Sequence, residues 1–281
     1  TDATILWDTT NDEFDFSHPV NVAGKVTSTG TSVFASLDIS GDIDVDGTTN
    51  LDIVDIDGAA NFAADVTLAN GADLITASAG LSNVRFGVNA GNSIASGGNY
   101  NVVVGDEAGT ALTTGDGNVA VGFEALKTED ANNANTAIGH QALKTLNAGA
   151  TGYNTAVGFT AGIAMTTALE NTLIGALAGD AITTGNSNTA VGMSALSAAT
   201  TGTLNVAIGK DALRDNTTAG ANTAVGTVSM RLNTTGASNT AVGYGTLDTN
   251  TTGASNVAIG RDSLTANTTA SNNTAVGYAS L

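Results

Sequence analysis

The sequence predicts an all-β protein, in which a solenoid of stacked parallel β-coils follows a short-stranded β stalk. The first observation is a frame, Asn-x-x-x-Gly, that recurs twelve times. Its glycines are Gly87, Gly105, Gly122, Gly139, Gly158, Gly175, Gly192, Gly209, Gly226, Gly243, Gly260 and Gly277. Successive intervals are 18, 17, 17 and 19 residues, then seven of 17, and so short and strict a period is typical of solenoids. The second is composition: 4% aromatic residues and 35 Gly leave few large side chains for a globular core.

Each coil is expected to contain one short strand and a turn-rich return segment. Counting from the frame asparagine as position 1, positions 2 to 4 mostly read Thr/Val, Ala and Val/Ile. Since strand residues alternate between faces, we expect the Val/Ile of position 4 to fill the interior and the small Ala of position 3 to face outward. A second apolar anchor stands at position 9, as in Leu213 and Leu247. Four coils have Gly there, and an apolar residue such as Leu112 or Met165 follows within a few places.

The frame asparagines and glycines are predicted to be structural. Asparagine accepts the left-handed αL conformation, stacked amides bond from coil to coil, and glycine permits a tight turn with positive φ. In the regular C-terminal coils this assignment covers Asn188, Gly192, Asn205, Gly209, Asn222, Gly226, Asn239, Gly243, Asn256, Gly260, Asn273 and Gly277. Asn-x-Thr at Asn216, Asn233, Asn250 and Asn267 fits the glycosylation rule, but it follows automatically from a repeated Asn-Thr-Thr turn.

Two segments precede the solenoid, which is predicted over residues 81–281. In residues 1–19, apolar residues alternate on both sides of Thr9–Asp12, which predicts a β-hairpin. In residues 20–80, apolar and acidic residues alternate and Gly ends each run, which predicts a stalk of short strands with one apolar face. One chain would leave that face uncovered, so we expect a homotrimer.

Charge and composition exclude several functions. The net charge is −18, with −13 of it in residues 1–80, which disfavours binding to nucleic acid or anionic membranes. No apolar run is long enough for membrane insertion, and the chain has no Cys. Asp42–Gly47 matches the first half of a calcium-binding loop, but Ile53 stands where that loop needs a bidentate Glu. We therefore expect no metal and no other cofactor.

Enzymes and ice-binding proteins are rival classes. With two His and acids mostly in alternating strands, no nucleophile–base or carboxylate pair stands out, and we expect no enzymatic activity. Some phage tailspikes cleave polysaccharide with carboxylate pairs on a β-solenoid, so that alternative stays open. An ice-binding face needs an unbroken threonine ladder, and Val206 and Val257 interrupt the threonines of position 2.

Position 6, directly after the frame glycine, is the least constrained place in the coil. Stacking sets these residues in a longitudinal row: Val88, Asp106, Phe123, His140, Phe159, Ala176, Met193, Lys210, Thr227, Tyr244, Arg261 and Tyr278. If the row is exposed, its cations and tyrosines suit a glycan or another polar polymer, and Lys210, Tyr244, Arg261 and Tyr278 form the candidate surface-binding row. If the row lies between chains, Phe123, Phe159 and Met193 suit packing.

Two sets of residues carry a resemblance to known families. The frames Asn205–Gly209 and Asn256–Gly260 resemble the Val-Ala-Ile-Gly repeats in the heads of trimeric autotransporter adhesins, although the present repeat is longer. The longer form Asn-Thr-Ala-Val-Gly-Tyr-x-x-Leu and the opening Ile5–Asp12 are similar to bacteriophage tail-fibre proteins, particularly those of marine phages.

The resemblance implies a homotrimeric tail fibre of the virion. Its N-terminal end would bind other virion or tail proteins, and its distal part would touch a glycan or protein on the host surface. A bacterial trimeric autotransporter-type adhesin is the alternative, as is a structural spacer whose receptor-binding tip lies beyond residue 281.

Overall fold

The computed structural model describes residues 5–8, 13–16, 79–149 and 151–281. The chain divides into two compact units, residues 1–66 and 67–281. In the first unit, β1 (Ile5–Asp8) pairs antiparallel with β2 (Glu13–Phe16). Nearly all of the predicted stalk over residues 20–80, including Asp42–Gly47, lies outside the described residues.

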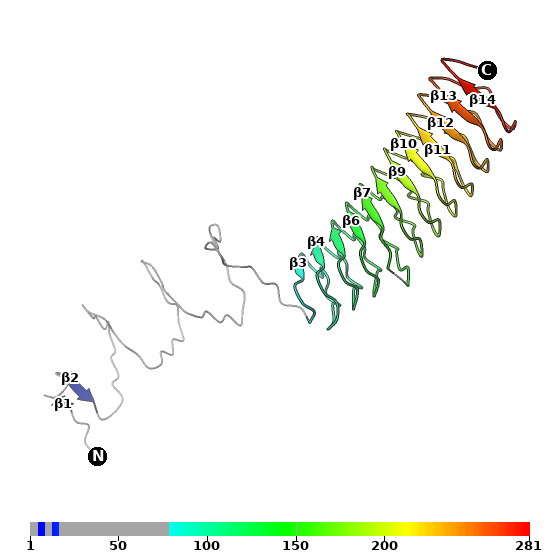
Figure 1. Cartoon of the computed structure of the whole chain (residues 1–281). Coiled ribbons are helices and arrows are strands. Elements are labelled where there is room, and N and C mark those ends of the chain that lie inside the picture. The colour runs from blue at the N-terminus through cyan, green and yellow to red at the C-terminus, as the bar shows by residue number, and fades with distance from the viewer. Residues whose placement is uncertain (1–4, 9–12, 17–78, 150) are drawn as a thin grey trace. The chain divides into compact units, whose positions relative to one another are not determined.

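The second unit contains a parallel β-solenoid (Figure 1). One sheet runs in sequence order from β3 to β14, with one strand of three residues for each repeat. These strands are β3 (Val84–Phe86), β4 (Val102–Val104), β5 (Val119–Val121), β6 (Thr136–Ile138), β7 (Thr155–Val157), β8 (Thr172–Ile174), β9 (Thr189–Val191), β10 (Val206–Ile208), β11 (Thr223–Val225), β12 (Thr240–Val242), β13 (Val257–Ile259) and β14 (Thr274–Val276). Equal positions pair between neighbours, as Ala207 does with Ala190 and Ala224. The predicted stack of parallel coils is confirmed, and the described residues contain no helix.

The inner and outer faces of the strands are exchanged relative to the prediction. The position 3 alanines point into the coil, and Ala207 and Ala241 are fully buried. The position 4 residues point outward, with Ile208 39% and Val242 37% exposed. The prediction was wrong because alternation separates two faces without saying which is inside. The larger size of Val and Ile suggested that they fill the interior. The coil is thin, however, and side chains of the return segment already fill its interior.

Positions 9 and 12 share the filling of that interior. Where position 9 is Leu or Met it is buried, as in Leu213 and Met230, which confirms the predicted anchor. Where position 9 is Gly, the buried residue stands at position 12, as in Leu112 and Met165. A Cβ added at Gly109 would lie 2.8 Å from Leu112 Cδ1, so in this coil Leu112 occupies the volume that a side chain at position 9 would need.

Two leucines, Leu173 and Leu281, depart from the patterns at positions 3 and 9. Leu173 replaces alanine at position 3 of a coil in which position 9 is Gly, as it is in the preceding coil, and it is fully buried. A Cβ at Gly162 or Gly179 would come within 2.9 Å or 2.8 Å of its methyl groups. Leu281, the position 9 residue of the last repeat, is 82% exposed.

The frame asparagines form a continuous buried ladder, as their structural assignment predicts. The backbone N–H of each donates to the Oδ1 of the preceding one, for example Asn222 to Asn205 at 3.1 Å and Asn239 to Asn222 at 2.9 Å. The Nδ2 of most also donates across its own coil to the position 15 carbonyl, as Asn222 does to Gly236 at 2.9 Å. One side chain therefore joins neighbouring coils and closes its own coil.

The backbone role expected of these asparagines lies one residue earlier. The αL conformation is adopted by the residue before the frame asparagine, such as Leu204 (φ 60°) and Ser238 (φ 59°), and not by the asparagine itself. The reason is that the asparagine begins the strand and uses its amide for the ladder, so the preceding residue must make the turn.

A second amide ladder runs along position 12 in the C-terminal coils. Asn233 donates to Asn216 at 2.9 Å, Asn250 to Asn233 at 2.7 Å, and Asn267 to Asn250 at 2.8 Å. Asn216, Asn233 and Asn250 are fully buried. In the folded solenoid these three Asn-x-Thr sites are therefore closed to glycosylation.

We predict that Gly243→Ala destabilises the solenoid, by about 1–3 kcal/mol in each chain. The φ of Gly243 is +139°, and a Cβ there would lie 2.6 Å from the Gly260 carbonyl oxygen. Gly117→Ala is the matched control, since φ is +64°, no atom lies within 4 Å, and Ala134 adopts the same conformation one coil later. Denaturant unfolding compares the two; equal midpoints for both variants would contradict the prediction.

Candidate binding surface

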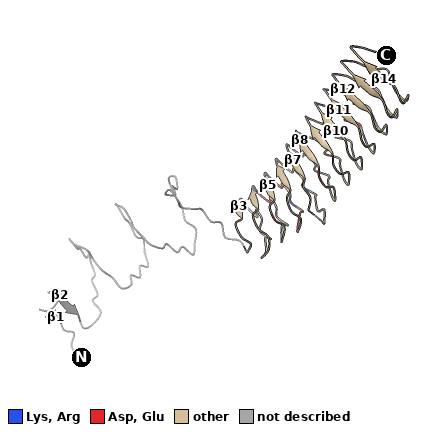
Figure 2. Cartoon of the chain, in the orientation of Figure 1, with Lys and Arg blue, Asp and Glu red and all other residues tan. Residues whose placement is uncertain are grey.

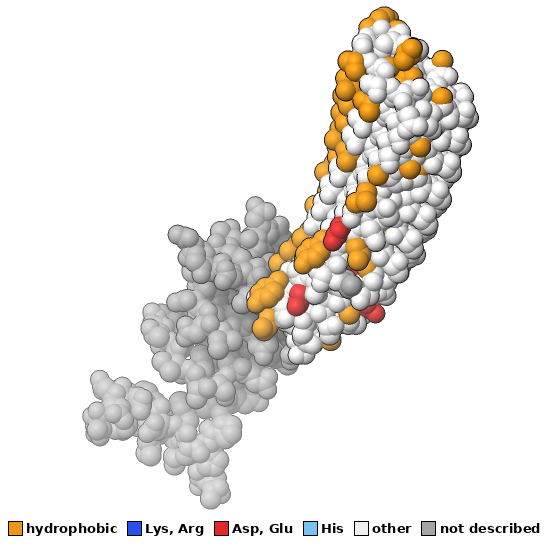
Figure 3. All heavy atoms as spheres, turned by 45° about the vertical axis from the view of Figure 1, so that its right-hand side comes forward, with side chains coloured by type: hydrophobic (Ala, Val, Ile, Leu, Met, Phe, Trp, Pro, Cys, Tyr) orange, Lys and Arg blue, Asp and Glu red, His pale blue; other side chains and the backbone are white. Residues whose placement is uncertain are grey.

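The outer face of the sheet carries a continuous line of apolar side chains. This apolar stripe consists of the position 4 residues Phe86, Val104, Val121, Ile138, Val157, Ile174, Val191, Ile208, Val225, Val242, Ile259 and Val276. All are partly or largely exposed, and the exposed fraction of Val276 is 67%. Figure 3 shows hydrophobic side chains following one side of the solenoid along its axis. An exposed apolar surface of this extent is typical of an interaction site.

Position 6 forms the longitudinal row that the sequence predicts, and it is exposed in the single chain. Phe123, His140 and Phe159 stack along the axis, with ring centroids 5.3 Å and 5.1 Å apart. Phe123 is 42% and Phe159 55% exposed. Because these rings stack on one another, their edges point away from the column.

The candidate row at the C-terminal end is brought together only in part. The Arg261 guanidinium carbon lies 5.4 Å from the Tyr244 ring centroid and 6.0 Å from that of Tyr278, so the three form one cation–π column. Lys210 is outside that column: its Nζ is 3.8 Å from a carboxylate oxygen of Asp211. Its side chain is 57% exposed.

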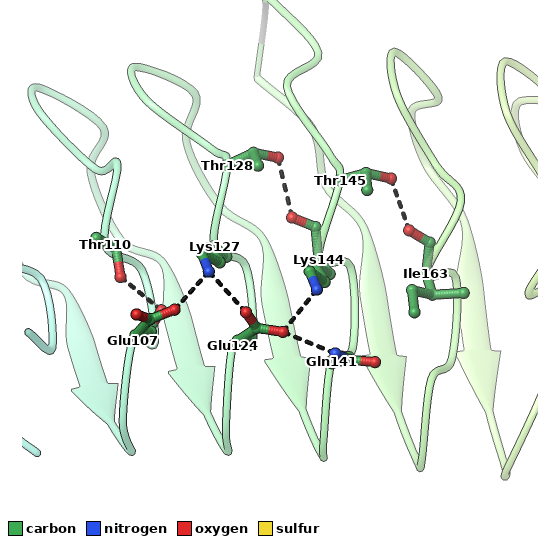
Figure 4. A network of polar contacts seen from close by, with 9 residues as sticks. All are labelled: Glu107, Thr110, Glu124, Lys127, Thr128, Gln141, Lys144, Thr145 and Ile163. Atoms are coloured by element: carbon green, nitrogen blue, oxygen red, sulfur yellow. Dashed lines mark hydrogen bonds and ion pairs between the residues drawn. The ribbon is translucent and has the colours of Figure 1, made fainter. Parts of the chain in front are cut away.

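An ion network ties three N-terminal coils together (Figure 4). Glu124 accepts from Lys127 at 2.6 Å, from Lys144 at 2.6 Å and from Gln141 at 2.7 Å, and Lys127 also contacts Glu107. Hydrogen bonds from Lys127, then Lys144 and Gln141, lower the pKa of Glu124 to about 2. Glu124 is therefore ionised at neutral pH and has no proton to donate as a general acid.

Outside this network, most of the solenoid ribbon is uncharged (Figure 2). Among the described residues there is no pocket and no group of three His, Asp or Glu side chains placed to hold a metal ion. In the same residues, no helix has the length and apolarity needed to cross a membrane.

Comparison of the chain with protein-family models, with curated proteins and with solved structures gives no match.

Glu129 is a buried acid that the sequence analysis did not single out. It occupies position 12, in the row that Leu112 and Leu146 fill in the adjacent coils, and it is fully buried. Its Oε1 accepts the Asn132 backbone N–H at 3.1 Å, while its Oε2 has no hydrogen-bond partner within the described part of the chain. Burial raises the pKa of Glu129 to about 7. The alignment of position 12 would have revealed it, as the one acid in that row.

We predict that Glu129 makes the solenoid more stable in mild acid than at neutral pH. The pKa rises from 4.5 to about 7 on folding, so the stabilising effect of the bound proton is complete below about pH 4.5 and is lost as the pH rises through about 7. The loss is up to about 3 kcal/mol. Unfolding at pH 5 and pH 8 should show this step in the natural chain and not in Glu129→Gln.

Asp130→Asn is the control for that experiment, because Asp130 is adjacent and exposed, and burial, not the charge of Asp130, is the largest cause of the raised pKa of Glu129. It should keep the pH step. If the stability of the natural chain and that of Glu129→Gln changed with pH in the same way, the Glu129 carboxyl would be solvated, and a raised pKa for Glu129 would be wrong.

Proposed function

We propose that the chain is a segment of a homotrimeric virion fibre that attaches a phage to its host cell surface. The observation that carries the proposal is the apolar stripe, because it lies outside the coil and takes no part in the core of a single chain. A rod of stacked coils with one exposed apolar line needs a partner along its whole length.

Another copy of the same chain is the partner that fits. The stripe repeats once per coil, at the spacing of adjacent strands of about 4.8 Å. Only a surface with the same repeat can keep every row in contact over so many coils, and a second copy in parallel register has that repeat. Threefold symmetry is favoured by the resemblance of Asn205–Gly209 to the repeats of trimeric adhesins.

Attachment is favoured over catalysis by the form of the surface. The exposed position 6 row offers repeated aromatic and cationic side chains along the axis, without an enclosing pocket in the described residues. Such a surface makes many weak contacts, which become effective when three chains and several fibres bind together. A host glycan or protein displayed in many copies is the matching target.

We predict that charges placed on the apolar stripe abolish assembly and leave the coil folded. Ile208→Lys, Val225→Lys and Val242→Lys together put three cations into the proposed interface, where unpaired burial is costly. Because these side chains point away from the core, the β-rich circular dichroism spectrum should persist while ultracentrifugation shows a monomer.

Thr218→Lys, Thr235→Lys and Thr252→Lys form the matched control, since these exposed residues lie in the same three coils. That variant should remain a trimer. A natural chain that is monomeric and folded at micromolar concentration would refute the trimer itself.

We predict that the purified trimer blocks adsorption of the parent phage to its host. Soluble fibre occupies the same receptors, so adsorption should fall with increasing fibre concentration. Changing Tyr244, Arg261 and Tyr278 together to Ala should weaken the block. A trimer that neither binds cells nor competes with the phage would leave this segment a spacer and reject attachment by it.

A further inference from the structure

The three arginines of the C-terminal coils differ in how their guanidinium groups are used. Arg214 donates through Nε and Nη2 to Asp215, at 2.7 and 2.9 Å, and Arg231 donates in the same way to Asp248, at 3.1 and 3.0 Å. Arg261 donates to Asp262 through Nε alone, at 3.1 Å. Its two terminal nitrogens make no hydrogen bond to the described residues.

Arg261 is also the most exposed of the three. Its side chain is 62% exposed, against 35% for Arg214 and 34% for Arg231. The Tyr244 and Tyr278 rings flank it from the coils before and after, and they are 53% and 75% exposed. The cation is thus held in place by two rings and one carboxylate, while the donors at its end face no acceptor among the described residues.

We propose that Arg261, flanked by Tyr244 and Tyr278, is an oxyanion subsite that binds the carboxylate of an acidic sugar in a surface polysaccharide. This proposal rests on the proposed role in attachment and names the class of ligand. A free guanidinium edge bonds a carboxylate through two parallel N–H donors. Because stacking already restricts the side chain, less conformational entropy is lost on binding.

The two tyrosines supply the rest of a sugar site. Their exposed ring edges and hydroxyl groups lie on both sides of the cation, where they can contact the C–H and O–H groups of the sugar units next to the acid. The Phe123–His140–Phe159 column is also built at position 6, but it has imidazole in place of the guanidinium and phenyl in place of phenol. It therefore lacks the pair of parallel N–H donors that the guanidinium offers to a carboxylate.

The test measures binding of two probes to the assembled full chain. Oligogalacturonate carries a carboxylate on each sugar, and dextran oligosaccharide of equal length is neutral. The natural chain should bind the acidic probe and not the neutral one. Arg261→Gln should weaken binding of the acidic probe at least about tenfold, since a charge-assisted bidentate contact is lost.

Two further variants separate the effect of the paired guanidinium N–H donors from the effect of the positive charge. Arg214→Gln removes the same charge from an arginine whose nitrogens are already bonded to a carboxylate, and it should bind nearly as the natural chain does. Arg261→Lys keeps the charge without the paired N–H donors, and it should bind more weakly than the natural chain. A sulfated dextran in a third arm tells a requirement for carboxylate from one for any oxyanion.

Several results would overturn the subsite. Equal losses in Arg261→Gln and Arg214→Gln would indicate general charge attraction. Binding of dextran as strong as that of oligogalacturonate would reject an acidic ligand, although attachment to a neutral glycan would stand. If Arg261→Gln changed the oligomeric state, the arginine would lie between copies. If the acidic probe bound as expected while the trimer failed to block phage adsorption, the subsite would stand and the proposed function would fall.

Discussion

The structure of the solenoid depends on the buried asparagine at the first position of each coil. Its Oδ1 accepts the N–H of the next asparagine, and in most coils its Nδ2 donates across the coil to the carbonyl at position 15. A buried amide must satisfy both groups, because an unpaired one costs about 1–3 kcal/mol. The ladder therefore fixes the stacking of coils and the distance across each one. In the 19-residue coil, the Asn135 Nδ2 also donates to the Asn133 carbonyl, at 3.3 Å.

A coil closed at that distance has a thin interior, and this decides where the large side chains lie. Side chains from positions 9 and 12 fill most of the space, and in most coils the strand adds only alanine. The β-branched residues of the strand are left outside in a line. The same constraint that stabilises the single coil thus produces the surface through which we propose that copies assemble.

Stacking at one repeat also converts each position of the coil into a column along the axis. A position that does not contribute to the core can then form an extended surface, with one side chain from each coil. Position 6 does so with Phe123–His140–Phe159 and with Tyr244–Arg261–Tyr278. Ion pairs also form between stacked coils, because Glu124 is paired to a lysine of its own coil and to one of the next coil. Contacts between coils, and not a pocket, are the means by which this chain arranges side chains.

The sequence alone was sufficient to predict the repeat, its register, the parallel coils, the anchor at position 9 and the structural role of Asn222 or Gly243, since all of these follow from residue type at a fixed period. It also predicted that position 6 forms a row. The folded coil was needed to show which strand face is inside, because alternation is symmetric and the volume left by Leu213 or Leu112 is a property of the closed coil. It alone placed the turn on Leu204 instead of Asn205, buried Glu129, and set Arg261 between two tyrosines while Lys210 stayed apart, since those outcomes depend on distances across and between coils.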